Sequence, residues 1–202
     1  MRRIWPGAFL FIVFACGSPR THYYTLAPVG SERPAADDGQ PIKIGQVIVA
    51  AMLDRDSLVE WSGSGEIQIS EQDRWAAPLD GMIRGVVAED LRERLPVHVY
   101  LPGDVVAPGP VRSVDLNVRR FGAQENQQVT LIADWSLLSG NPPIAVLNRN
   151  ESVKVTLKSN RTADVVLAMN RALAELSDRI AAAIVKSGNS PARQVRNSAT
   201  SS

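Results

Sequence analysis

The 202-residue sequence has one cysteine, two histidines and few aromatic residues. The single cysteine, Cys16, excludes an internal disulfide. His22 and His98 lie too far apart in the sequence for a dedicated zinc site, so we expect no metal. The sequence also lacks a phosphate-binding loop, a dinucleotide fingerprint and a GxSxG elbow, and we expect no cofactor. The net charge is only +1, without the basic excess typical of nucleic-acid-binding proteins.

The first residues have the form of a lipoprotein signal peptide. Arg2 and Arg3 precede an apolar run over 4–14, which is too short to span a membrane. The run ends in Val-Phe-Ala-Cys, similar to a lipobox, with the bulky Phe14 as a departure. We therefore predict a signal peptide over 1–15, lipidation of Cys16 and a tether over 16–22. The alternative is a chance cysteine within a cleaved secretory signal.

A long amphipathic helix is predicted between Pro78 and Pro96. Its apolar residues recur at spacings of three and four, which places them on one face. They are Leu79, Met82, Ile83, Val86, Val87 and Leu91. Gly81 and Gly85 within this helix would allow another backbone to approach closely. Because one apolar face cannot be buried by a lone helix, the helix must pack on a sheet.

The remaining pattern supplies that sheet. Strands are predicted over 23–26, 42–51, 57–61, 66–70, 97–100, 114–121 and 128–138, and Val153, Val155 and Leu157 mark one more. The run over 42–51 is expected to be a mostly buried central strand. A second amphipathic helix is predicted over 162–186, with a disordered tail over 187–202. The prediction is one α/β domain over 23–186, with a mixed, mostly antiparallel sheet and two long helices packed on it.

Candidate site residues gather in the corner before the first helix. Trp75 lies beside Arg74, and the corner ends at Pro78. Trp75 could plug the strand–helix angle, or it could anchor a contact with a partner or lipid, because Trp and Arg are enriched in interface hot spots. We therefore predict Arg74, Trp75 and Pro78 as candidate partner contacts. No catalytic residue is predicted, and His98 is expected to be structural.

The same corner carries a resemblance to a known family. The run Arg74-Trp75-Ala76-Ala77-Pro78-Leu79-Asp80 resembles the RWAxPLD-type signature of PqiC-like lipoproteins. These are auxiliary lipoproteins of ABC-type transport systems that carry an MCE protein. The runs 23–26, 53–55 with 58–59, 115–118 and 135–138 agree with the family in order and spacing. The resemblance spans 16 to about 186, and the Ser-rich tail departs from it.

The resemblance implies an anticodon-binding-like fold and a non-enzymatic function. The protein would be lipid-anchored on the periplasmic face of the outer membrane, where it docks a periplasmic MCE-domain protein. An inner-membrane permease and an ATPase would supply the energy for lipid transport, and a homo-oligomeric ring is plausible. Two alternatives stay open: a lipid-anchored periplasmic hydrolase using acids near Asp54 and Asp73, and a lipoprotein that binds lipid in its own pocket.

Overall fold

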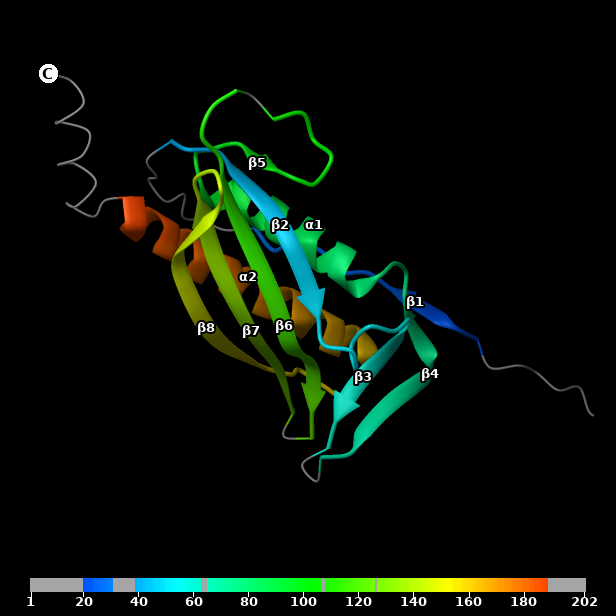
Figure 1. Cartoon of the computed structure of the whole chain (residues 1–202). Coiled ribbons are helices and arrows are strands. Elements are labelled where there is room, and N and C mark those ends of the chain that lie inside the picture. Colours follow the sequence, from blue (N-terminus) through cyan, green and yellow to red (C-terminus); the bar gives the residue numbers. More distant parts are fainter. Residues whose placement is uncertain (1–19, 31–38, 63–64, 107, 126, 189–202) are drawn as a thin grey trace, which may run out of the picture.

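The structure, a computed structural model, describes residues 20–30, 39–62, 65–106, 108–125 and 127–188 (Figure 1). The predicted signal peptide, Cys16 and the tail after Gly188 lie outside these residues. The described chain forms eight strands and two helices. In order they are β1 (His22–Tyr24), β2 (Ile42–Val49), β3 (Ser57–Trp61), β4 (Ile67–Trp75), α1 (Leu79–Arg94), β5 (Val99–Tyr100), β6 (Arg112–Gln124), β7 (Gln128–Ser139), β8 (Ile144–Thr156) and α2 (Thr162–Gly188).

The strands form one mixed sheet organised around β6. Along one edge, β6 pairs antiparallel with β7, which pairs antiparallel with β8. Along its other edge, the first half of β6 pairs parallel with β2, and its last residue pairs with the end of β3. Beyond β3 come β4 and then the short parallel strand β1. The longest pairings are antiparallel, so the predicted mixed, mostly antiparallel sheet is confirmed.

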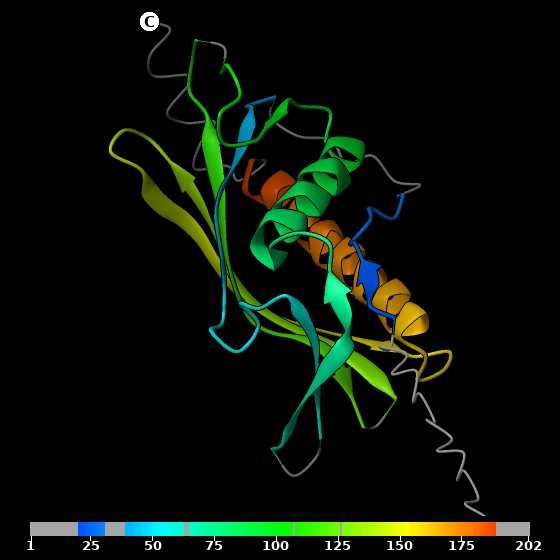
Figure 2. The ribbon, with the colours of Figure 1, turned by 90° about the vertical axis from the view of Figure 1, so that its right-hand side faces the viewer.

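Both helices lie on the same face of the curled sheet (Figure 2). Helix α1 packs over β2 and β5, α2 packs over β6, β7 and β8, and the helices contact each other. The predicted apolar face of α2 is buried throughout. Its members are Val165, Val166, Met169, Leu173, Leu176, Ile180 and Ile184. The two-helix α/β domain predicted from the sequence periodicity is therefore confirmed.

Several strand predictions need correction. The strand predicted over 42–51 is not mostly buried: Ile42, Ile44 and Val47 face the helices, while Ile48 on the opposite face is 50% exposed. Strand β8 begins at Ile144, well before the predicted Val153. The prediction missed this start because the first half of the strand is an exposed edge without apolar alternation. Strand β4 continues to Trp75, since pairing with β1 extends it through the predicted corner.

Helix α1 also differs from expectation in its glycines. A side-chain carbon added at Gly81 or Gly85 would meet no atom within 4 Å. No other backbone among the described residues therefore approaches the helix at these positions. Both are surface positions of the helix, where glycine costs about 1 kcal/mol relative to alanine.

One glycine of the sheet is required by packing. At Gly122 in β6, an added Cβ would lie 2.5 Å from the Trp61 ring and 2.6 Å from the Val59 carbonyl oxygen. The Arg120 guanidinium lies over the same ring, 5.7 Å from its centroid. Trp61 is thereby buried where β3 joins β6, and the β3–β4 hairpin is held against the rest of the sheet.

Candidate functional site

The candidate site is the corner between β4 and α1, residues 74–78. Strand β4 carries Arg74 and Trp75 as its last residues, and α1 begins directly after Pro78. The Trp75 N–H donates to the Asp56 carbonyl oxygen at 2.6 Å, and the Ala76 N–H donates to the Tyr24 carbonyl oxygen at 2.8 Å. The corner is thus held by backbone bonds to two separate segments, which fixes the direction in which α1 leaves the sheet.

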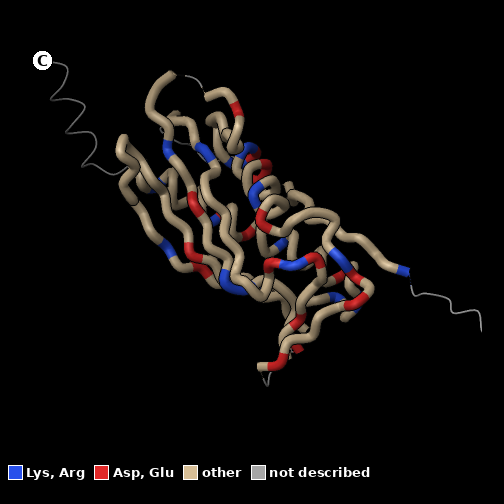
Figure 3. Tube along the Cα trace, turned by 45° about the vertical axis from the view of Figure 1, so that its right-hand side comes forward, with Lys and Arg blue, Asp and Glu red and all other residues tan. Residues whose placement is uncertain are grey.

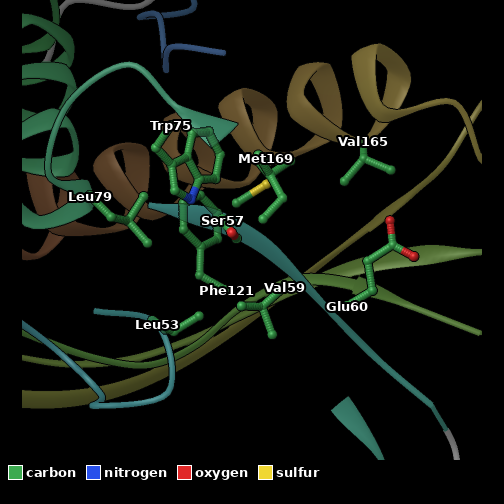
Figure 4. Close-up of a pocket in the computed structure, with 10 residues that line it drawn as sticks. Leu53, Ser57, Val59, Glu60, Trp75, Leu79, Phe121, Val165 and Met169 are labelled. Atoms are coloured by element: carbon green, nitrogen blue, oxygen red, sulfur yellow. The ribbon is translucent and has the colours of Figure 1, made fainter. Parts of the chain in front are cut away.

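Trp75 is the interior part of the corner. Its side chain is only 6% exposed and points between Leu79, Phe121 and Met169 (Figure 4). The hollow left around it measures about 10 Å³, close to the least volume that holds one water molecule. Of the two interpretations drawn from the sequence, this burial matches the packing plug. Burial of an indole on this scale is worth a few kcal/mol.

The outer part of the corner is exposed. Ala76, Ala77 and Pro78 all lie at the surface, and Arg74 is half-buried. Tyr23, which pairs in register with Arg74, is 68% exposed. Among the described residues no ion pair engages the Arg74 guanidinium. We call these five residues the corner surface: it offers an aromatic ring, a cation and small apolar groups side by side.

A polar cluster around Asp73 lies directly behind the corner. The Thr162 hydroxyl donates to Asp73 Oδ2 at 2.9 Å, and the Ser70 hydroxyl donates to the same oxygen at 3.2 Å. His22 Nδ1 lies 3.4 Å from Asp73 Oδ1. Burial and then the Asp73 carboxylate raise the pKa of Tyr24. The cluster ties β1, β4 and the first residue of α2 together, and so it positions the corner surface.

Asp54 and Asp73, the acids of the hydrolase alternative, lie in different surroundings. Asp54 lies exposed in the turn after β2, whereas the partners of Asp73 are hydroxyls and His22. His98 is exposed and stacks on Tyr100, with ring centroids 6.1 Å apart. In the part of the chain that the structure describes, no group of three or more metal-binding side chains gathers.

A buried ion pair within α1 is hydrogen-bonded to side chains of α2. Arg94 Nη1 lies 3.2 Å from Asp90 Oδ1, and the two side chains are 2% and 0% exposed. Ser177 Oγ donates to Asp90 Oδ2 at 3.2 Å, and Arg94 Nε donates to Asp178 at 2.5 Å. Burial raises the pKa of Asp90, while Arg94 and the hydrogen bonds act against that rise. The network fixes the far end of the helix that starts at the corner.

None of the described helices is long and apolar enough to cross a membrane. Cys16 lies outside the described residues, so its lipidation stays a prediction.

Comparison with known proteins shows to which family the chain belongs. A family model for the ABC-type transport auxiliary lipoprotein component matches residues 24–181. The chain belongs to this family. It is 26% identical over 127 residues to the intermembrane transport lipoprotein PqiC of Escherichia coli (strain K12), which is 60% of this chain and 65% of that protein. The protein of the same name from Shigella flexneri gives the same values. The chain therefore spans just under two thirds of the length of these relatives.

Two solved structures share the fold of this auxiliary lipoprotein. A crystal structure of an uncharacterised protein superposes with a TM-score of 0.69 at 19% identity, covering 82% of this chain and 99% of that one. A protein from Xanthomonas campestris gives a TM-score of 0.63 at 19% identity, covering 83% and 96%. At these identities the likeness establishes the fold alone.

Sequence reasoning missed the Asp73 cluster and the Asp90–Arg94 pair. Asp73 and Thr162 are 89 positions apart, and Asp90 and Ser177 are 87 apart, so no local spacing connects them. One signal was available for the ion pair. Asp90 falls four residues after Val86 and three after Val87 on the helix, and hence lies beside the apolar face.

Proposed function

We propose that this auxiliary lipoprotein is a non-enzymatic docking component of an intermembrane lipid transport system. Cys16 carries the lipid anchor, and the domain sits on the periplasmic face of the outer membrane. There it receives a periplasmic MCE-domain protein, whose inner-membrane permease and ATPase supply the energy. The observation that carries this proposal is the family match over residues 24–181, supported by the 26% identity to PqiC.

The position of β1 supports the corner surface as the contact. His22 follows Cys16 by six positions, which at about 3.4 Å per residue limits the reach to roughly 20 Å. Strand β1 pairs with the end of β4, so the corner surface lies beside the point where the tether enters the domain. A partner that delivers lipid to the membrane must end close to it. Arg74 and Pro78 then contact the partner, and Trp75 holds them in place from behind.

The proposal is tested by co-purification from membranes. Tagged full-length protein should enrich a periplasmic MCE-domain protein, with crosslinking to retain weak complexes. Arg74→Glu and Ala77→Arg should each reduce that enrichment at least tenfold, because they change groups of the corner surface. Arg171→Glu, an exposed reversal on α2, is the matched control and should leave enrichment unchanged.

Two results would count against this function. If the wild-type protein never enriches the MCE-domain protein, the docking role fails. If the corner variants enrich it as well as wild type, the contact lies elsewhere on the domain. The anchor has its own test: Cys16→Ser should move the protein from the membrane to the soluble periplasmic fraction, and retention at the membrane would contradict lipidation at Cys16.

The described hollows at Trp75 and near Glu60 give no comparable support to a lipid pocket within the domain. Pockets for drug-sized ligands measure about 300–1,000 Å³ and are mostly apolar. The apolar hollow at Trp75 is about 10 Å³. A larger hollow of about 220 Å³ near Glu60 is lined in part by carboxylates and amides, a wall suited to a charged group more than to acyl chains.

A further inference from the structure

A polar hollow of about 220 Å³ lies between the β3–β4 hairpin, the end of β6 and the start of α2. None of the five corner-surface residues lines it, although Glu60 and Val165 also line the hollow at Trp75. Carboxylates and amides form one part of its wall, and apolar side chains form the rest. The polar lining residues are Glu60, Gln68, Gln124, Glu125 and Asn160, and the apolar ones are Trp61, Ala123, Leu157 and Val165.

Register places the Glu60 side chain toward this hollow. Glu60 and Gln68 are directly opposite in the antiparallel β3–β4 pair, so their side chains share one face of the hairpin. The neighbouring pairs, including Val59 with Ile69, project from the other face. Figure 4 shows the Glu60 carboxylate directed toward Val165 in the first turn of α2. A charged group therefore points from the sheet into the space in front of the helix.

This carboxylate has no partner within the described residues. No hydrogen bond or ion pair engages Glu60, although the side chain is half-buried. Burial is the main cause that raises its pKa, and the Asp73 carboxylate adds to the rise. A half-buried carboxylate that faces another negative charge is stabilised when a cation approaches.

One cation lies beside the hollow: the Arg120 guanidinium stacks over the ring of Trp61, which lines it. No Lys or Arg occurs between Arg55 and Arg74, nor between Arg120 and Arg149. Figure 3 accordingly shows acidic residues without basic ones near the tip of the β3–β4 hairpin, and Arg74 lies at the opposite end of β4. On the α2 side, Arg161 is paired with Asp164 at 3.0 Å, and Lys158 is exposed. The hollow is thus an electronegative site bordered by amide oxygens.

We propose that this hollow binds a primary ammonium group carried on a short alkyl chain. An ammonium has three N–H donors and no acceptor. The Glu60 carboxylate can accept one of these, and the amide oxygens of Gln68, Gln124 and Asn160 are available for the others. The alkyl chain would lie against Val165. Such a group can come from the headgroup of an aminophospholipid or from a free amine. The site does not depend on the docking function proposed above.

The proposal is tested by calorimetric titration of the full-length protein in detergent with propylamine at pH 7, with 1-propanol as the uncharged probe. We expect saturable binding of propylamine with a Kd near the millimolar range, and none of propanol. Glu60→Gln should weaken propylamine binding at least tenfold, because it removes the charge while keeping the shape. Glu66→Gln, an exposed acid of the same hairpin, is the matched control and should change the Kd less than twofold.

Lipid retention distinguishes the two sources of the ammonium group. Native mass spectrometry with added phosphatidylethanolamine or phosphatidylcholine should show preferential retention of phosphatidylethanolamine that Glu60→Gln abolishes, if a headgroup is the ligand. Propylamine binding without that preference identifies a free amine. The proposal is overturned if propylamine does not bind saturably and neither lipid is preferred. It is also overturned if Glu60→Gln, folded with an unchanged or raised Tm, binds propylamine like wild type.

Discussion

The Asp90–Arg94 pair makes a quantitative prediction about stability. Arg94→Ala removes a guanidinium that is 2% exposed and leaves the wholly buried Asp90 carboxylate without its counter-charge. Breaking a buried pair in this way costs about 3–5 kcal/mol. With an m-value of about 2 kcal/mol/M in urea, the unfolding midpoint should fall by roughly 1.5–2.5 M. Urea titration followed by tryptophan fluorescence measures the change.

A matched control and a double variant separate the causes. Arg84→Ala, also in α1, breaks a partly exposed pair with Asp80 and should cost only about 0–1 kcal/mol. Asp90→Leu combined with Arg94→Met removes both charges and fills similar volume, so it should recover at least half of the loss. If Arg94→Ala shifts the midpoint no more than Arg84→Ala, the reasoning is refuted.

The loss should also depend on pH. Burial already raises the pKa of Asp90, and removing Arg94 raises it further. An acid whose folded pKa lies above its unfolded value costs stability once it ionises, and that cost vanishes below the unfolded pKa of about 4. The deficit of Arg94→Ala relative to wild type should therefore be largest at pH 7 and shrink as the pH falls toward 4. A deficit that is constant with pH would show that lost packing, not charge, is responsible.

Three further predictions follow from single side chains. Trp75→Ala should destabilise the domain by about 3–5 kcal/mol, because it empties a packed position, and a Tm unchanged from wild type would contradict the burial seen here. Gly122→Ala should cost about 1–3 kcal/mol through its clash with the Trp61 ring, whereas Gly81→Ala on exposed α1 should stabilise by up to about 1 kcal/mol. Thermal denaturation of both glycine variants checks the opposite signs. Glu60→Gln should raise the Tm at pH 7 but not at pH 4. The pKa of Glu60 is raised in the folded protein, so the carboxylate costs stability only when it is ionised. An equal change in Tm at both pH values would contradict this.

Local periodicity predicted both helices and two of the three long strands, β6 and β7. The spacing of apolar residues located α1 and α2 to within a residue or two at each end. Alternation likewise located β6 and β7, since each has one face on the core and one toward solvent. These patterns are readable because a helix or half-buried strand repeats its surroundings at a fixed period. The run at 74–80 also marked the family correctly.

Pairing between distant segments decided what periodicity could not. Trp75 was expected in a corner, but three residues of β1 pair with β4 and extend it through that position. The first half of β8 escaped prediction because β7 alone holds it, with most of its side chains in water. A strand that is specified by its neighbour's backbone needs no apolar pattern of its own.

The surroundings of two charged groups, Arg94 and Glu60, were determined by tertiary structure alone. Arg94 lies in the last turn of α1, and packing of α2 over α1 buries it with Asp90. Glu60 lies in β3, and the pairing of the hairpin directs it toward the start of α2. In sequence a charge carries only its sign. Its burial and its partners come from elements far along the chain, because desolvation and Coulomb energy depend on distance in space.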